Sequence, residues 1–361
     1  MILKLQDIYT SDAIAGYIDK VKPELVESYV LKALFPDKKV TGLDYSYIKT
    51  TNGVIELTAP SAYDAEPIAQ NRAGFDAMTG AMPLFRRKMV LSEKERQKLL
   101  TALAVGTEEG VKAILREIFD DQMTLVRGAR MTMEFLRSRV LMDGKINIES
   151  KGGAVSIDYK VPSNHKFTLS GAGQKWSDPD TDIVGQIQGW LDTVEDETGI
   201  RPDSIIMNRK TFKYLRANKG IRANMIPLSV LASAAVANSV FITDDQITAT
   251  FKALTGLTNV IVHNSKVSMD KKVYDLIEDN KVCIYPSSIK LGDTLIGTSP
   301  AEFSAQYIAN AGNEIAITAE GIAVNAYVED RAPYTSGTEV EFIAIPSFEG
   351  SDFVIQATVE S

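Results

Sequence analysis

The sequence predicts an α+β fold in which one long helix carries an antiparallel sheet and a separate α/β domain is inserted between the parts of that sheet. An apolar stripe from Val111 to Val140 predicts the long helix. Alternating helix and strand patterns predict the inserted domain, and period-two strands near the end predict a return to the sheet. We expect an arm (1–40), an extended loop (41–91), a first domain with the long helix and a hairpin (92–179), the inserted α/β domain (180–300) and the returning strands (301–361).

Composition disfavours several classes of function. The chain has 361 residues, 45% of them hydrophobic, which is enough for a sizeable core. Its 39 Lys and Arg against 47 Asp and Glu give a net charge of −8, which disfavours dedicated nucleic-acid binding. One cysteine, Cys283, cannot form an intramolecular disulfide, and two histidines leave little material for a metal centre. Without a signal peptide or a membrane-spanning run, we expect a soluble chain made in the cytoplasm.

The arm and the extended loop cannot form a core of their own. Helical patterns cover 11–21 and 24–34 and are interrupted by prolines. In the loop, Asn52-Gly53 predicts a hairpin turn between strands at 45–48 and 54–57. A polar stretch to Met82 and a return strand at 83–90 follow, and so much half-polar extended chain predicts a loop that lies against a partner.

Two helices should follow the loop. Ser92 and Glu95 form a capping-box pattern for a helix that ends at Gly106. The long spine helix then begins at Thr107 and continues through Met142, which is 36 residues or about 54 Å at about 1.5 Å per residue. Gly128 within it predicts a bend or a close contact.

The remaining elements alternate and then return to strands. A hairpin is predicted at 146–161, followed by a helix that begins at Asp178 with Ile183, Ile187, Trp190, Leu191 and Val194 on its buried face. The inserted domain continues with strands at 205–207, 259–262 and 282–285, and with helices from Thr211, near Ser229 and from Asp244 to Gly256. Strands at 322–328, 340–344 and 353–359 should join the 146–161 hairpin in one sheet on the spine helix.

No motif predicts a catalytic site. Gly171-Ala172-Gly173 lacks the third glycine and the strand–helix context of a dinucleotide loop. Asp178, Asp180 and Asp182 are spaced like the start of a calcium loop, but Ile183 and Gly189 stand where a glycine and a glutamate are required, so helix capping explains them better. We expect Cys283 in a core strand, and His165 and His263 at the surface or a boundary.

Arginines along the spine helix have two explanations. Arg116, Arg127, Arg130, Arg137 and Arg139 either form a solvated face or pair with carboxylates of a neighbouring subunit, for which the acids of the 59–82 stretch are the natural candidates. Our candidates for inter-subunit contacts are Asp64, Glu66, Arg72, Arg86, Arg87, Arg127, Arg130 and Arg137.

The order of these parts resembles the HK97-type fold of tailed-phage major capsid proteins. Short stretches resemble its lambda-like branch, the major capsid protein E family. They are Leu57-Thr58-Ala59-Pro60, Ala62-Tyr63-Asp64-Ala65-Glu66-Pro67 with Arg72, Met82-Pro83-Leu84-Phe85, Trp176-Ser177-Asp178-Pro179 with Asp182-Ile183, and Gly297-Thr298-Ser299-Pro300.

The resemblance implies a structural protein of the virion, not an enzyme. It implies hexamers and pentamers of this chain, made in the host cytoplasm, around packaged double-stranded DNA that is not bound sequence-specifically. Residues 41–91 become the E-loop, about 180–300 the axial domain, and the spine helix with the β regions the peripheral domain.

The resemblance also bears on partners. It suggests a separate scaffold protein and a portal, and it is compatible with a protease and a decoration protein, with no cofactor, metal or membrane. No Lys–Asn crosslinking trio can be assigned. The alternatives are an encapsulin-like compartment shell, a carboxylate-based hydrolase that uses acids of 180–300, and a tail or adhesion protein.

Overall fold

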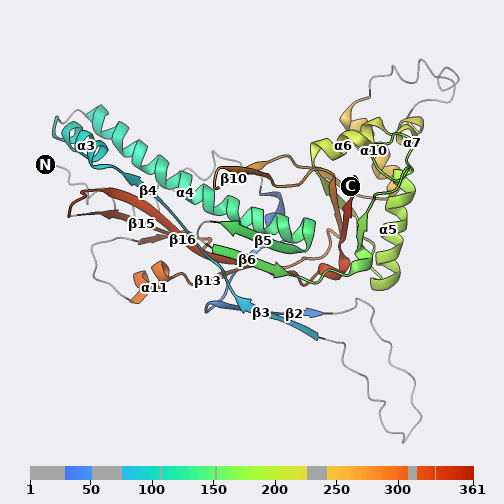
Figure 1. The fold of residues 1–361 in the computed structure, drawn as a ribbon, viewed down its shortest axis with the longest axis horizontal. Coiled ribbons are helices and arrows are strands. Elements are labelled where there is room, and N and C mark those ends of the chain that lie inside the picture. The colour runs from blue at the N-terminus through green and yellow to red at the C-terminus, as the bar shows by residue number, and fades with distance from the viewer. Residues whose placement is uncertain are drawn as a thin grey trace, which may run out of the picture. The chain divides into compact units, whose positions relative to one another are not determined.

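The computed structural model describes residues 29–50, 75–105, 108–150, 153–225, 242–307, 315–329 and 331–361 (Figure 1). The chain forms two compact units. Unit 1 comprises Met1–Ser46, Thr79–Leu136 and Asp293–Ser347, and unit 2 comprises Tyr47–Met78, Arg137–Gly292 and Phe348–Ser361. Each unit is therefore assembled from segments that are far apart in the sequence.

None of the helices in the described ranges is long and apolar enough to cross a membrane.

The predicted spine helix is confirmed as α4, Glu108–Asp143, of 36 residues. The described part of its apolar stripe is buried, from Leu125 and Ala129 to Val140. Gly128 does not break the helix. A Cβ at this position would lie 3.9 Å from Nη1 of Arg87, an ordinary van der Waals distance, so packing does not require a glycine here.

Unit 1 is built on a six-stranded sheet that packs against α4 (Figure 1). Its strands are β1 (Asp37–Lys39), β4 (Leu84–Leu91), β13 (Thr294–Gly297), β14 (Ile315–Ile317), β15 (Ala323–Val328) and β16 (Ser336–Pro346). The longest strand, β16, pairs β4, β13 and β15 antiparallel. Alternate residues such as Val324, Val340 and Phe342 face Met123, Val126 and Met133 of the helix, which gives the unit its core.

Short elements complete unit 1. They are the 3₁₀ turn η1 (Val30–Ala33), α3 (Glu93–Val105) and α11 (Pro300–Tyr307). The capping box of α3 is confirmed, because Ser92 N donates to Glu95 Oε2 (2.9 Å) and Glu95 N to Ser92 Oγ (3.5 Å). In the described part of 24–34 only η1 is helical, since Pro36 prevents its extension. The helix expected at 11–21 lies outside the described residues.

The extended loop begins and ends as a two-stranded ribbon of β2 (Asp44–Thr50) and β3 (Phe75–Ala81). Strand β3 was not predicted, because residues 75–81 fall in the stretch predicted as polar and their glycine and alanines give no strand signal. The strand expected at 54–57 lies outside the described residues. The return strand at 83–90 is confirmed as β4.

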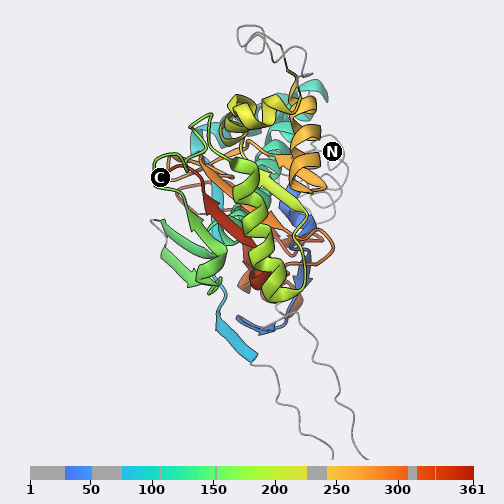
Figure 2. The ribbon, with the colours of Figure 1, turned by 90° about the vertical axis from the view of Figure 1, so that its right-hand side faces the viewer.

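Unit 2 contains a five-stranded sheet with helices on one face (Figure 2). The strand order is β7 (Lys166–Thr168), β17 (Ile355–Thr358), β12 (Lys281–Tyr285), β8 (Ser204–Met207) and β9 (Asn259–Val262). The helices are α5 (Ile183–Thr198), α6 (Arg209–Ala217), α7 (Lys219–Ala223) and α10 (Asp244–Thr255). The predicted buried face of α5 is confirmed, and it shares one core with strand residues such as Ile205, Val282 and Ile355.

Two sheet assignments were wrong. The 146–161 hairpin forms its own two-stranded sheet, β5 (Lys145–Ser150) with β6 (Gly153–Asp158), and does not join the sheet of unit 1. The strand near 355 pairs β12 and β7 in unit 2. Alternation in a sequence reports which side chains share a face, and it does not identify the strand's neighbours.

Other differences concern boundaries and small elements. Helix α5 begins at Ile183 and not at Asp178, because Asp182 is its N-cap and accepts from Gly185 N at 2.9 Å. A ribbon of β10 (Lys266–Met269) and β11 (Lys272–Asp275) was not predicted, and its turn has positive φ at Asp270 and Lys271. Two 3₁₀ turns, η2 (Ser163–His165) and η3 (Ser351–Phe353), complete the unit. The helix expected near Ser229 lies outside the described residues.

Candidate assembly surfaces and the charged network of unit 2

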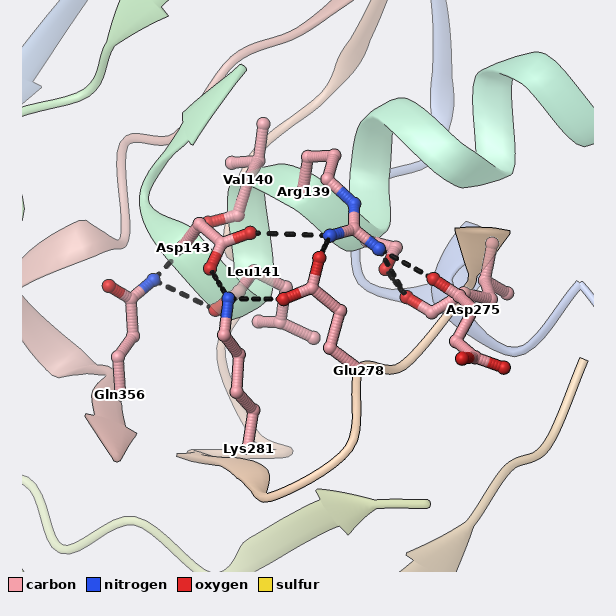
Figure 3. Close-up of polar contacts among 10 residues, drawn as sticks. Arg139, Val140, Leu141, Asp143, Asp275, Glu278, Lys281 and Gln356 are labelled. Carbon is pink, nitrogen blue, oxygen red and sulfur yellow. Dashed lines mark hydrogen bonds and ion pairs between the residues drawn. The ribbon is translucent and has the colours of Figure 1, made fainter. Parts of the chain in front are cut away.

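A network of four ionised side chains holds the last turn of α4 within unit 2 (Figure 3). Arg139 is its centre, with a side chain that is only 9% exposed. One guanidinium nitrogen pairs with Glu278 and lies 3.5 Å from Asp143 Oδ2, while the other donates to the carbonyls of Asp275 (2.6 Å) and Leu276 (3.3 Å). Burial lowers the pKa of Arg139, and the carboxylate of Asp143 acts in the opposite direction.

Lys281, the first residue of β12, is the second cation of the network. Its ammonium pairs with both Asp143 and Glu278. Each carboxylate therefore lies between two cations, and the four charges cancel. A partly buried cluster in which every charge has partners avoids the desolvation cost of an unpaired ion. It contains no nucleophile or base that is free for chemistry, so its role is structural.

The carbonyl groups in the last turn of α4 also accept hydrogen bonds from a side-chain amide of the unit 2 sheet. Gln356 of β17 donates from Nε2 to the carbonyls of Leu141 (2.8 Å) and Val140 (3.3 Å) (Figure 3). Gly144, with φ +66°, follows the helix in the left-handed conformation, and its N–H bonds Val140 O at 2.9 Å. The last carbonyls of a helix have no intrahelical donors, so these bonds fix where the spine helix ends.

A second carboxylate joins three segments at one end of the unit 2 sheet. Asp203 accepts from Ser287 N (2.7 Å) and Oγ (2.6 Å), from Ser204 Oγ (3.0 Å) and from Thr258 Oγ1 (3.2 Å). Burial alone would raise the pKa of Asp203, but these hydrogen bonds outweigh it and hold the pKa below its usual range. Asp203 was not singled out from the sequence because two of its donor residues, Thr258 and Ser287, are distant in the chain.

The base of the β2–β3 ribbon is fixed in unit 1 by close packing at glycines. Tyr45 and Met82 are 6% and 7% exposed. A Cβ at Gly80 would lie 2.9 Å from the Tyr45 ring, and one at Gly297 would lie 2.8 Å from Met82 Cε and 3.0 Å from the carbonyl of Gly42. Only glycine permits these approaches.

The arginines predicted as contact candidates are placed in different environments. Arg86, on β4, pairs with Glu341 of β16. Arg87 is exposed beside Gly128 and has no ion pair with any described residue. Arg130 pairs with Glu320 at 3.1 Å.

Two further candidates lie on α4. Arg127 is half-buried, and its Nε has no hydrogen-bond partner. Arg137 is 2% exposed. Asp64, Glu66 and Arg72, like the side chain of Arg116, lie outside the described residues.

The cysteine and one histidine of the described chain are buried, and packing accounts for their positions. Cys283 is buried in β12 as predicted, and burial raises the pKa of its thiol. The prediction for His165 was wrong, since the ring is 0% exposed and its Nε2 lies 3.1 Å from Glu197 Oε2. It follows Pro162 in a turn packed near α5, a position that its polar sequence neighbours conceal. Among the described residues no group of three or more His, Cys, Asp or Glu could hold a metal ion.

The chain matches a known protein family over most of its length. The family model described as phage major capsid protein E matches residues 10–328, most of the chain. The chain belongs to the phage major capsid protein E family. A member of this family is a structural protein of the phage capsid shell, so this chain is a capsid protein, and its place is the virion capsid. The match favours the phage shell over the encapsulin-like alternative.

Two solved capsid structures and a phage-related protein share the fold of this capsid protein. The putative capsid protein of a prophage of Escherichia coli CFT073 is 14% identical, with a TM-score of 0.58 over 97% of this chain and 99% of that chain. The capsid protein of cyanophage A-1(L) is 11% identical, with a TM-score of 0.51 over 93% and 95%. A phage-related protein of Bordetella bronchiseptica RB50 is 13% identical, with a TM-score of 0.51 over 96% of each chain.

These likenesses confirm the predicted α+β capsid fold of the HK97 type. No curated protein sequence matches the chain.

Proposed function

We propose that this capsid protein assembles into a closed icosahedral shell of hexamers and pentamers around packaged double-stranded DNA. The observation that carries the proposal is the family match over residues 10–328. The net acidic balance, −8, suits this role, since a shell whose lumen gripped DNA would impede packaging. Many weak contacts per copy are enough for a stable shell, because they are multiplied over the assembly.

The proposed partners act on this shell during its assembly in the host cytoplasm. They are a scaffold protein, a portal and, on the outer surface, a decoration protein. A protease can accompany the scaffold. Within the chain, we propose that residues 41–91 form the E-loop that reaches an adjacent copy and that 180–300 form the axial domain. We propose that 92–179 and 301–361, apart from β17, form the peripheral domain and that 1–40 form a separate arm. The anchoring of Tyr45 and Met82 in unit 1 supports the first of these roles, because it gives the loop a fixed base.

The proposed inter-subunit contacts remain Asp64, Glu66, Arg72, Arg86, Arg87, Arg127, Arg130 and Arg137. Arg87 and Arg127 are the best supported, since neither has an ion-pair partner among the described residues. Arg86 and Arg130 already have carboxylates within their own copy, and Arg137 is buried.

Exchange of Arg127 for Glu tests this assignment. We expect R127E subunits to remain folded and to lose assembly, because a carboxylate would face the acids that the arginine binds. Lys213→Glu, at an exposed position on α6, is the control and should assemble normally. Normal particles from R127E would exclude Arg127 from the contact.

Negative-stain electron microscopy of the purified chain, after size-exclusion chromatography, tests the function itself. Closed particles, capsomer rings or sheets are the expected result. A chain that stays a small oligomer, even when produced with its scaffold protein, would contradict the proposal and direct attention to the carboxylates of the 180–300 domain.

Removal of residues 51–74 with a short Gly-Ser replacement tests the E-loop. The deletion spares Tyr45 and Met82, whose loss would open the core of unit 1. We expect a folded, soluble subunit that forms no shells. Complete particles from this variant would refute the assigned role.

A further inference from the structure

Two arginines flank Gly128 of α4, and neither is paired with a carboxylate of the described chain. Arg87 comes from β4, on the same side of the strand as Phe85 and Met89, which pack against the core of unit 1. Its Nη1 lies 3.9 Å from the position that a Cβ of Gly128 would take. Arg127 directly precedes Gly128 on the helix.

Arg127 has a hydrogen-bond donor that the described chain does not use. Its Nε is shielded from solvent and has no partner, although the side chain as a whole is half-buried. A charged group with a buried, unused donor is unfavourable. Arg130 on the same helix differs, because Glu320 lies 3.1 Å away and pairs with it. Arg127 therefore has capacity for an acceptor from outside its own copy.

Gly128 leaves room for that acceptor. Within 4 Å of a Cβ built there lies only the flexible end of Arg87, so the packing of unit 1 does not require a glycine that is unfavourable inside a helix. Thr124 and Thr132, one turn before and after, donate their hydroxyls to carbonyls of α4, both at 2.8 Å. The donors left on this surface are the guanidinium groups. We call these five residues, Thr124, Gly128, Thr132, Arg87 and Arg127, the Gly128 face.

The chemistry of the Gly128 face selects a segment with two carboxylates. Guanidinium groups bind carboxylates through paired N–H donors. Residues 51–74, between β2 and β3, contain three acids, Glu56, Asp64 and Glu66, and one cation, Arg72. Residues two positions apart in an extended chain point to the same side, so Asp64 and Glu66 can engage two arginines at once. A loop with about 12 residues in each direction reaches about 40 Å from its base at about 3.3 Å per residue.

We propose that the Gly128 face receives Asp64 and Glu66 of a second copy of this chain, with one carboxylate on Arg87 and the other on Arg127. The inference rests on the proposed function, in which residues 41–91 reach an adjacent copy, and it names the surface of that copy to which they bind. Gly128 keeps the space between the two arginines open for the segment that carries the acids.

Disulfide trapping tests the contact directly, because the cysteine of the chain, Cys283, is buried. Copies with Ala65→Cys, between the two acids, are mixed with copies with Thr124→Cys, at an exposed position of α4, and are oxidised after assembly. The disulfide between positions 65 and 124, identified by mass spectrometry, should exceed that obtained with Ala249→Cys on α10 by about tenfold or more, since a contact raises the effective concentration of the two thiols. Equal yields from the two mixtures would overturn the proposal.

The contact and the shell function fail in different ways. Wild-type shells in the microscope, without a disulfide between positions 65 and 124, would overturn the contact and leave the shell function standing. If the wild-type chain forms no shell, the shell function fails, and the disulfide in smaller assemblies still supports the contact.

Gly128→Leu separates the contact from a structural role. Leucine fills the space between the arginines, removes no charge and favours a helix more than glycine does, so the melting temperature should stay at or above that of wild type. The assembled fraction should fall by about tenfold or more, since the loss at one contact is repeated over the shell. Gly189→Leu on α5, where a Cβ also meets open space, is the matched control and should assemble like wild type. Full assembly of G128L, or an equal loss in G189L, would contradict the inference.

Discussion

Lys281 and Arg139 show how single charges in this capsid protein depend on one another. Both cations contact both Asp143 and Glu278, so removal of one leaves two partly buried carboxylates with half of their compensation. The pair of Arg139 with Asp143, four residues on along α4, could be read from the sequence. The pair with Glu278 could not, because Glu278 is distant in the chain and close only in the fold.

Replacement of Lys281 by Met tests the network. We expect a loss of about 1–3 kcal/mol in the free energy of unfolding, since the remaining carboxylates keep their desolvation but lose a partner. Urea unfolding followed by circular dichroism measures it. Lys213→Met, which removes an exposed lysine from α6, should change stability by less than about 0.5 kcal/mol. A similar loss in both variants would show that the network is not responsible.

Asp203 predicts a specific sensitivity to acid. Its pKa is lower in the folded chain than its usual value, so its contribution to stability is complete above the unfolded pKa, about 3.9, and disappears as the pH falls through the lower folded value. Stability of the wild type should therefore fall below about pH 4 more steeply than that of Asp203→Asn. Thermal melts between about pH 2 and pH 6 compare the two, and parallel curves would contradict the assignment.

At the scale of elements, most helices were predictable and several strand partners were not. The spine helix, the capping box at Ser92 and the helix from Asp244 to Thr255 follow from local signals, which a sequence displays directly. The place of β17 in unit 2 and the existence of β3 depend on contacts with distant strands. Strand pairing is a property of the whole chain, so alternation alone assigned these strands incorrectly or missed them.

Glycine contacts between elements lead to another prediction. A Cβ at Gly337 would lie 2.5 Å from the carbonyl of Met89, so Gly337→Ala must separate β16 from β4. We expect a destabilisation of about 1–3 kcal/mol, measured as a shift of the urea midpoint. Gly189→Ala in α5 has open space around it and should instead stabilise by about 0.5–1 kcal/mol. A neutral G337A would mean that the two strands tolerate displacement.

The net charge of the whole molecule predicts that the shell protein binds nucleic acid weakly. With a net charge of −8, we expect the purified chain not to shift double-stranded DNA in gel electrophoresis at physiological salt and micromolar protein. Binding of DNA that weakens steeply with added salt would indicate a concentrated basic surface. It would contradict the proposal that the shell does not bind its packaged DNA tightly.

The function of the chain could be predicted from its sequence, but the residues that contact other copies could not. The order of parts, with a spine helix between an extended loop and an α/β domain, indicated the capsid family, and the family match confirms it. Individual contacts could not be assigned, because a copy's surface charges acquire partners both inside and outside the copy. Arg86 and Arg130 illustrate the first case, since each pairs with a carboxylate of its own chain.

The position of β17 has a consequence for synthesis of the protein. This strand lies between β7 and β12, so the sheet of unit 2 stays divided until Ile355–Thr358 has left the ribosome. Gln356, which binds the final carbonyls of α4, arrives at the same moment. A nascent chain that has not yet reached these residues therefore cannot present a finished unit 2 to neighbouring copies, which delays polymerisation until the sheet can close.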